Sequence, residues 1–207
     1  EDRLVGIGDT DPAGVEGRLQ EDDRESAGFY DSVALLVTRE QPDALIIGTH
    51  CLEHTDYACA AAPFGLPIFL EKPVAVDMDQ AMRLEEAFRR HPCPVEVSFP
   101  LRVSPLCEMT HRYIKDGAIG TPEHIAAWNY VNYGTVYFED FYRDYHNTQG
   151  LFLQKATHDL DYMAMLMGSP IVRVAAMKTA GRVFGGDKPA GLRCSQCADA
   201  ETCLESP

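Results

Sequence analysis

The chain has 207 residues, of which 45% are hydrophobic, and its 18 basic and 32 acidic residues give a net charge of −14. This apolar content is enough for one large or two small folded domains, which excludes a disordered chain. The acidic balance disfavours nucleic acid and anionic lipid as partners, and no apolar run approaches the roughly 18 residues that span a bilayer.

In the first half of the chain, short apolar runs alternate with segments of helical period. The strand candidates are residues 4–8, 44–47, 68–70 and 95–98, and the helix candidates are residues 31–39, 53–64 and 77–90. Asp77 is a predicted N-cap with Gln80 three residues later, which is a capping-box arrangement. This alternation predicts crossover connections and a mainly parallel sheet, hence an α/β fold.

The pattern changes near Phe99, and we place the domain boundary there, with domains over residues 1–99 and 100–207. Ser104 followed by Pro105 predicts the N-cap and first turn of a helix that runs to about residue 115. After a Gly and Pro turn at 117–122, we expect strand-like residues 123–133, an aromatic loop, a helix over 151–167 and a further strand-like run at 171–179. The second domain is therefore expected to mix helices and strands.

The cysteine content predicts the cellular compartment, and the first residues predict where the native chain starts. The chain has seven cysteines, an odd number, and four lie scattered in segments of ordinary α/β pattern, which predicts a reducing compartment, the cytoplasm. The sequence opens at Glu1 without a Met and its first strand follows at once. We therefore expect the native start to lie upstream.

Lys72 follows the strand candidate at 68–70, within Glu71-Lys72-Pro73, at the end of a parallel strand where open α/β sheets place their ligands. The segment DALIIGTHCLEHTDYACAAAPFGLPIFLEKPVAVDMDQA resembles the strand, loop, helix, strand and Glu-Lys-Pro motif of the Gfo/Idh/MocA family, named for glucose-fructose oxidoreductase, inositol dehydrogenase and rhizopine catabolism. Downstream, FPLRVSPLCEMTHRYIKDGAIGTPEHI resembles the family's Arg-x-x-Pro helix and Gly-x-Ile-Gly turn, and GLFLQKATHDLDYMAMLMG resembles the helix of its catalytic His.

The resemblance implies an incomplete Rossmann domain over residues 1–99 and a truncated α+β substrate and dimerisation domain over 100–207. The family's opening strand and Gly-rich phosphate loop have no counterpart, because only eight residues precede Asp9. The resemblance further implies NAD as cofactor, with NADP as the alternative, a sugar, cyclitol or other polyol as substrate, and a homo-oligomer formed through the second domain.

The resemblance assigns acid/base catalysis to Lys72 and His158. For this role the pKa of Lys72 must fall from about 10.4 to about 7 or 8, through partial burial and the positive nicotinamide ring. Gln154, His158 and Asp161 lie at i, i+4 and i+7 on an otherwise apolar helix, which predicts substrate contacts for Gln154 and Asp161. Asp161 is also expected to fix the tautomer or orientation of His158. Gln154 stands where many family members have Asp, which excludes a catalytic carboxylate there. The alternatives are a surface lysine and a buried core histidine.

Several residues are predicted to bind the cofactor. Asp9 ends the first strand, where a Rossmann domain places the acid that binds the adenosine ribose and favours NAD over NADP. Its alternative is a simple turn and helix cap at residues 9–12. The other candidates lie in the loop after the second strand candidate, in the Glu-Lys-Pro motif and at the domain boundary: Thr49, His50, His54, Glu71, Lys72, Pro73 and Arg102.

Two groups of residues in the second domain have open roles. Arg143 belongs to a loop whose composition suits a carbohydrate-binding wall or a dimer surface. The other members of this loop are Tyr130, Tyr133, Tyr137, Phe138, Phe141, Tyr142, Tyr145 and His146. Cys194, Cys197 and Cys203 form C-x2-C-x5-C without a convincing fourth ligand, so we predict no metal and keep them as weak candidates beside a redox-sensitive loop or free thiols.

These residues together predict an NAD(P)-dependent oxidoreductase that moves hydride to or from a hydroxyl-bearing carbon. An NAD-dependent glycosidase on the same scaffold is one alternative, and a non-catalytic binding or regulatory protein is another.

Overall fold

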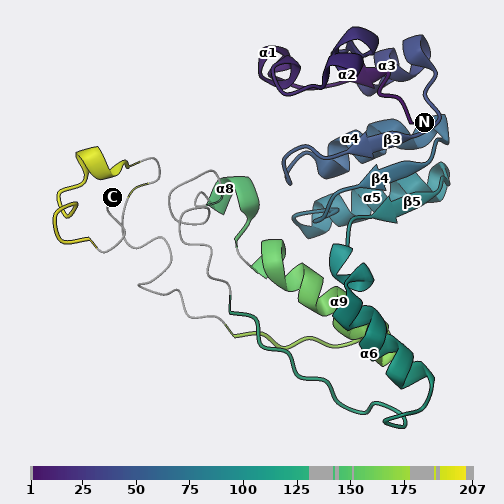
Figure 1. Cartoon of the computed structure of the whole chain (residues 1–207), viewed down its shortest axis with the longest axis vertical. Coiled ribbons are helices and arrows are strands. Elements are labelled where there is room, and N and C mark those ends of the chain that lie inside the picture. The colour runs from purple at the N-terminus through teal and green to yellow at the C-terminus, as the bar shows by residue number, and fades with distance from the viewer. Residues whose placement is uncertain are drawn as a thin grey trace. The chain divides into compact units, whose positions relative to one another are not determined.

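The computed structural model describes residues 2–130, 142, 145–150, 152–177, 189 and 192–203 (Figure 1). The chain divides into two compact units, Glu1–Ser98 and Phe99–Pro207, which we call unit 1 and unit 2. Within the described residues no helix has the length and apolar character needed to cross a membrane.

All strands of unit 1 are parallel to their neighbours, as the α/β prediction requires. Strand β1 (Gly6–Ile7) pairs with β2 (Gly28–Phe29) in one small sheet. Strands β3 (Leu45–Ile47), β4 (Ile68–Leu70) and β5 (Val95–Val97) form a second sheet in the order β3-β4-β5. In this sheet Leu45 lies opposite Ile68, which lies opposite Val95. The sequence prediction is confirmed for four of these five strands, and it missed β2.

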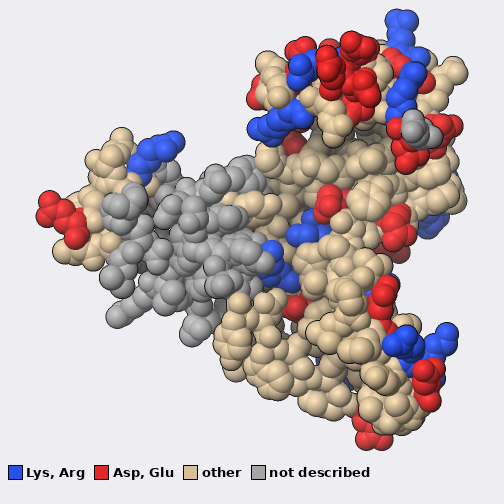
Figure 2. All heavy atoms as spheres, in the orientation of Figure 1, with Lys and Arg blue, Asp and Glu red and all other residues tan. Residues whose placement is uncertain are grey.

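Helices connect the strands of unit 1. They are α1 (Pro12–Glu16), α2 (Glu21–Ser26), α3 (Val33–Glu40), α4 (His54–Ala61) with the 3₁₀ turn η1 (Ala62–Phe64), and α5 (Met78–Arg90). Gly65 ends the α4–η1 segment with φ 67°, a left-handed conformation that glycine adopts without steric cost. The helices expected over residues 31–39, 53–64 and 77–90 are confirmed, whereas α1 and α2 were not predicted. Figure 2 shows Asp and Glu side chains gathered over α1 and α2.

The core of unit 1 lies between α4, α5 and one face of the β3-β4-β5 sheet. Leu45, Ile47, Ile68 and Leu70 alternate along β3 and β4 and pack with Ala58, Ala61 and Leu84. The small alanine side chains let α4 approach the sheet closely. On the opposite face Ile46 is 80% exposed, so the described helices cover only one side of this sheet at that position.

The cap predicted for α5 is present in part. The Asp77 side chain accepts a hydrogen bond from the Gln80 backbone N–H at 2.8 Å. Gln80 does not return this bond to Asp77; its Oε1 accepts instead from the Val76 backbone N–H at 3.1 Å. The side chain of Gln80 therefore ties down the segment before the helix.

Unit 2 is helical in its described part. After the 3₁₀ turn η2 (Pro100–Val103), the Ser104 hydroxyl accepts from the Cys107 N–H and begins α6 (Pro105–Lys115), as predicted. The helix predicted over 151–167 consists of a π-helical turn η4 (Phe152–Ala156) and α9 (Thr157–Met167), and α9 packs against α6. Two shorter elements are α8 (Tyr145–Thr148) and η5 (Cys194–Gln196).

The two strands predicted in unit 2 are wrong where the structure describes them. Residues 123–130 and 171–177 form no strand. A strand needs a hydrogen-bonded neighbour, and strand-like composition alone does not provide one. The remaining residues of these two runs, 131–133 and 178–179, lie outside the described part of the chain.

Candidate active site

A cavity of about 440 Å³ opens in unit 1 at the carboxyl ends of β1, β2 and β3. Its polar lining comes from residues that lie shortly after the ends of these strands: Asp9, Thr10, Tyr30, Asp31, Ser32 and Thr49. Its apolar lining includes Val33, Leu36, Leu45, Ile46, Ile47 and Ala61. Open α/β sheets bind their ligands at this end of their strands, so the cavity is the candidate cofactor site.

The cavity is lined by residues of β3 and by residues that follow β1, β2 and β3. Among the described residues, β1 pairs only with β2, and β3 pairs only with β4. The orders β2-β1 and β3-β4-β5 match strands 3-2 and 4-5-6 of a doubly wound dinucleotide-binding sheet. The cavity is therefore bordered by segments that follow strands of both sheets.

Asp9 lies at the polar rim of this cavity. One of its carboxylate oxygens accepts a hydrogen bond from the Asp11 N–H at 2.7 Å, and Asp11 in turn caps α1 by accepting from the Gly14 N–H. The predicted turn and helix cap is thus present at residues 9–12. Asp9 also lines the cavity, so its carboxylate combines a turn contact with a place in the lining.

Thr49 carries a buried hydroxyl group at the cavity. Its hydroxyl oxygen is buried and has no hydrogen-bond partner among the described residues, although the residue lines the cavity. Buried hydroxyl groups are nearly always hydrogen-bonded, so this one fits a polar group of a bound molecule. His50, the next residue, is exposed and is not among the cavity-lining residues.

His54 lies away from the cavity lining and contacts the backbone. Its ring nitrogens lie 2.7 Å from the Pro73 carbonyl oxygen and 2.9 Å from the Thr49 carbonyl oxygen. The sequence suggested a cofactor contact for this residue, and it gave no indication of these two backbone contacts. The His54 ring therefore joins the loop after β3 to the segment after β4.

The Glu71-Lys72-Pro73 segment directly follows β4. The Glu71 N–H donates to the Ile47 carbonyl at 2.9 Å, which extends the pairing of β3 and β4 by one residue. The Glu71 carboxylate accepts from the backbone N–H of Lys72 at 3.2 Å. The Lys72-Pro73 peptide bond is cis, and Lys72 is half-buried. Lys72 is thus held at the end of a central strand by its backbone.

In unit 2, Arg102 and Asp161 bind each other. Arg102 donates from Nε to Oδ2 at 2.7 Å and from Nη2 to Oδ1 at 2.5 Å, the bidentate geometry of a strong ion pair. The Asp161 side chain is 11% exposed and that of Arg102 is 49% exposed. The two residues were predicted separately, and no sequence signal links positions 59 residues apart.

Gln154 and His158 lie on the η4 and α9 segment. Gln154 is 2% exposed, and its amide donates to the Thr148 carbonyl at 3.3 Å. The His158 ring meets the Phe99 ring edge to face, with centroids 5.9 Å apart. Such packing orients the imidazole of His158 in unit 2.

Family models match both halves of the chain. Residues 1–99 match the model described as "Oxidoreductase family, NAD-binding Rossmann fold", and residues 108–192 match the model described as "GFO/IDH/MocA C-terminal domain". The chain belongs to the Gfo/Idh/MocA family. The resemblance seen in the Glu-Lys-Pro and His-containing segments is thereby confirmed.

Curated proteins and solved structures agree with this family. The chain is 27% identical to scyllo-inositol 2-dehydrogenase (NAD(+)) of Bacillus subtilis over 183 residues, 84% of this chain and 48% of that protein. It is 30% identical to the uncharacterized oxidoreductase YrbE of the same organism over 65% of this chain and 38% of that protein. A putative dehydrogenase from Bordetella bronchiseptica superposes with a TM-score of 0.68 at 21% identity, over 80% of this chain and 43% of that one. The chain spans about half the length of these Gfo/Idh/MocA relatives or less.

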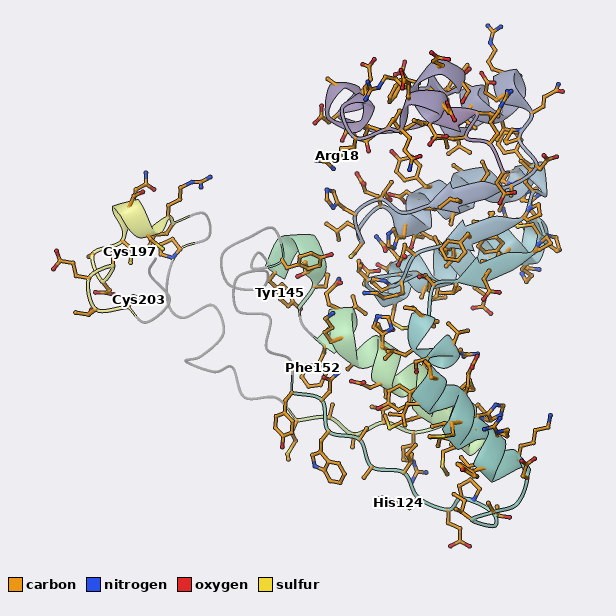
Figure 3. All side chains as sticks on the ribbon, in the orientation of Figure 1. Arg18, His124, Tyr145, Phe152, Cys197 and Cys203 are labelled. Atoms are coloured by element: carbon orange, nitrogen blue, oxygen red, sulfur yellow. The ribbon has the colours of Figure 1, made fainter. Side chains whose placement is uncertain are left out.

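Part of the predicted substrate site lies outside the described residues. This is the case for Arg143, for Tyr133, Tyr137, Phe138 and Phe141, and for the side chain of His146. The described aromatic residues of the same group are Tyr130, Tyr142 and Tyr145, all exposed, and Figure 3 labels Tyr145 on α8.

The C-terminal cysteines show no metal-site geometry. Cys194 and Cys197 are half-buried and Cys203 is exposed, and all three thiols are free. Figure 3 labels Cys197 and Cys203. Within the described residues, no three or more His, Cys, Asp or Glu side chains gather as metal ligands.

Proposed function

We propose that this chain carries the cofactor site and the acid/base residues of an NAD-dependent oxidoreductase acting on a sugar, cyclitol or related polyol. The observation that carries the proposal is the cavity at the carboxyl ends of three parallel strands, with a carboxylate at its rim and a partnerless buried Thr49 hydroxyl. Membership of an oxidoreductase family and several relatives named as inositol dehydrogenases support this substrate class.

The lining of the cavity suits the adenosine half of NAD. The Asp9 carboxylate would accept hydrogen bonds from the ribose hydroxyls, and its negative charge would repel the 2′-phosphate of NADP. The Thr49 hydroxyl would bond a further polar group of the same molecule. Bound NAD supplies the hydride acceptor for oxidation, and NADH the donor for reduction.

Lys72 is the proposed acid/base group. Its amine would take the proton of the substrate hydroxyl as the hydride leaves the same carbon, and would return the proton in the reverse direction. His158 is the proposed second proton-transfer group. Gln154, Asp161 and Arg143 are proposed to bind substrate hydroxyls. Asp161 would accept from a hydroxyl through the carboxylate lone pairs that its ion pair with Arg102 does not use. We further propose a cytoplasmic homo-oligomer formed through unit 2.

The experiment is a turnover assay of the intact protein with NAD and a panel of inositols and sugars, read as NADH absorbance. Replacing Lys72 by Met keeps the length of the side chain and removes its amine. We expect kcat to fall by about 10²- to 10⁴-fold, while NAD affinity measured by calorimetry stays close to that of the wild type. Lys115→Met, at an exposed position on α6, is the matched control. Undiminished turnover by the Lys72 variant, or no NAD binding by the wild type, would contradict the proposal.

A further inference from the structure

The pairing of β3 and β4 ends at Ile47 and Glu71, yet the two segments that follow remain connected. The connection is made by the side chains of His54, Thr55 and Gln80, which we call the loop clamp. His54 and Thr55 open α4, and Gln80 lies in the first turn of α5. All three reach backbone groups of the segments that follow β3 or β4, so they fix these segments where the sheet no longer does.

His54 is the central member of the loop clamp. The residue is 1% exposed, and its ring lies between the carbonyl oxygens of Thr49 and Pro73. Thr49 lines the cavity, and Pro73 directly follows Lys72. One buried ring therefore connects the candidate cofactor site with the backbone that carries the candidate acid/base residue.

Thr55 and Gln80 reinforce this connection on the same side. The Thr55 hydroxyl lies 2.9 Å from the Val74 carbonyl oxygen and 3.1 Å from Gln80 Oε1. The Gln80 amide group donates to the Leu52 carbonyl at 3.0 Å. Leu52 belongs to the loop after β3 and Val74 to the segment after β4, so both segments are held at more than one point.

We propose that His54 is a positioning residue that sets the place of Lys72 relative to the cofactor cavity. This inference rests on the proposed acid/base role of Lys72. A proline fixes its own φ angle, so holding the Pro73 carbonyl restricts the backbone of the residue before it. A shift of about 1 Å in a catalytic group lowers turnover by up to about 10²-fold, because proton and hydride transfer both depend on alignment. A neutral imidazole has one ring N–H and donates to one of these two carbonyls, and an imidazolium donates to both, whereas an apolar side chain of similar shape donates to neither.

The test compares His54→Phe with Leu84→Ala in the intact protein. Phenylalanine fills the space of the imidazole and offers no donor, whereas Leu84 belongs to the apolar core of unit 1 and its side chain has no hydrogen-bonding group. We expect His54→Phe to lower kcat by about 10- to 100-fold with KM for NAD and polyol within about threefold of the wild type. Leu84→Ala should lower stability and leave the kcat of the folded protein within about twofold. An unchanged kcat in His54→Phe, or an equal loss in Leu84→Ala, overturns the inference.

A second measurement keeps the inference separate from the proposed function. The acylation rate of the Lys72 amine is measured by mass spectrometry without substrate, with Lys115 as the exposed internal reference. We expect Lys72 to react about threefold faster in His54→Phe, because the loosened segment opens more often, and Lys115 to react at the same rate. If the wild type shows no turnover and Lys72 is labelled faster in His54→Phe, the proposed function is refuted and the positioning role stands. Unchanged labelling overturns the positioning role even where the wild type turns over. If His54→Phe does not fold, His54→Gln, which can donate to one carbonyl, is measured under the same criteria.

Discussion

Burial raises the pKa of the Cys59, Cys93 and Cys107 thiols. At Cys59 the nearby Arg83 lowers the pKa and Asp56 raises it, and both effects are smaller than that of burial. Because the thiolate is the reactive form, these three cysteines should be alkylated slowly at neutral pH. Cys59 and Cys93 pack against the core of unit 1, and Cys107 is buried in unit 2.

The raised pKa of Cys59 predicts a pH dependence of stability. Folding favours the protonated thiol, so its contribution to the free energy of unfolding is complete below the ordinary thiol pKa of about 8.5 and is lost as the pH rises through the folded-state value. In urea unfolding of the wild type between pH 7 and 10, we expect stability to decline at the alkaline end. Cys59→Ala should flatten this decline, and Cys203→Ala, at an exposed position, should not. Parallel curves for the wild type and Cys59→Ala would contradict the prediction.

The pair of Arg102 and Asp161 predicts a second effect at the residue scale. Removing the guanidinium leaves a mostly buried carboxylate without its bidentate donor, so Arg102→Ala should destabilise the protein by about 1 to 2 kcal/mol. Arg102→Lys should restore only part of this loss, because an ammonium group does not match both carboxylate oxygens. Arg112→Ala, on the exposed side of α6, is the control in thermal unfolding. Full recovery by lysine would show that charge alone matters at this site.

At the scale of elements, the cap of α5 is the most direct test of the helix boundaries. Asp77→Ala removes the acceptor of the Gln80 N–H and should lower stability by about 1 kcal/mol. Asp79→Ala removes a carboxylate in the same first turn, where the carboxylate interacts favourably with the helix dipole. This variant should lower stability by a few tenths of a kcal/mol. Both values come from the same denaturant titration. Equal losses would mean that the cap bond contributes little.

Most of the elements that sequence analysis found are long enough, or buried enough, to show a period, and β1 was found only because it lies in the largely apolar run at residues 4–8. Buried residues alternate along β3 and β4, and α5 shows helical spacing behind a recognisable cap. By contrast, β2 has two residues and α1 has five, which is too short for any period to appear. The strand expected at 171–179 was wrong over its described residues, 171–177, which suit a strand but have no neighbouring strand in the described chain.

The candidate site was predictable to the extent that strand ends determine it. Asp9, Thr49 and Lys72 each follow a strand, and their places could be read from the order of strands along the chain. The Arg102 and Asp161 pair and the two carbonyl contacts of His54 depend on how distant segments pack. Local sequence patterns do not indicate such contacts. The sequence could therefore identify these residues as candidates but could not identify their partners.

At the scale of the whole molecule, stability is distributed unevenly within unit 1. The β3-β4-β5 sheet packs against α4 and α5 through the main core. Strands β1 and β2 have two residues each, and a two-stranded pair is marginal by itself. Amides of β1 and β2 should therefore exchange with solvent through local opening, whereas those of β3 and β4 should exchange only when unit 1 unfolds.

Cofactor binding should change this distribution, because the cavity is lined by residues of β3 and by the segments that directly follow β1 and β2. With NAD at about 100 times its Kd, a state in which the cavity is intact gains about 2.7 kcal/mol over a state in which it is open. Hydrogen exchange measured by mass spectrometry should then show slower exchange in β1 and β2 and little change in β3 and β4, which are already held by the core. Asp9→Ala should weaken this protection with NAD and reduce the difference between NAD and NADP, since it removes both the ribose acceptor and the charge that repels a 2′-phosphate. Protection that rises equally across unit 1, or that Asp9→Ala leaves unchanged, would place the adenosine half of the cofactor elsewhere.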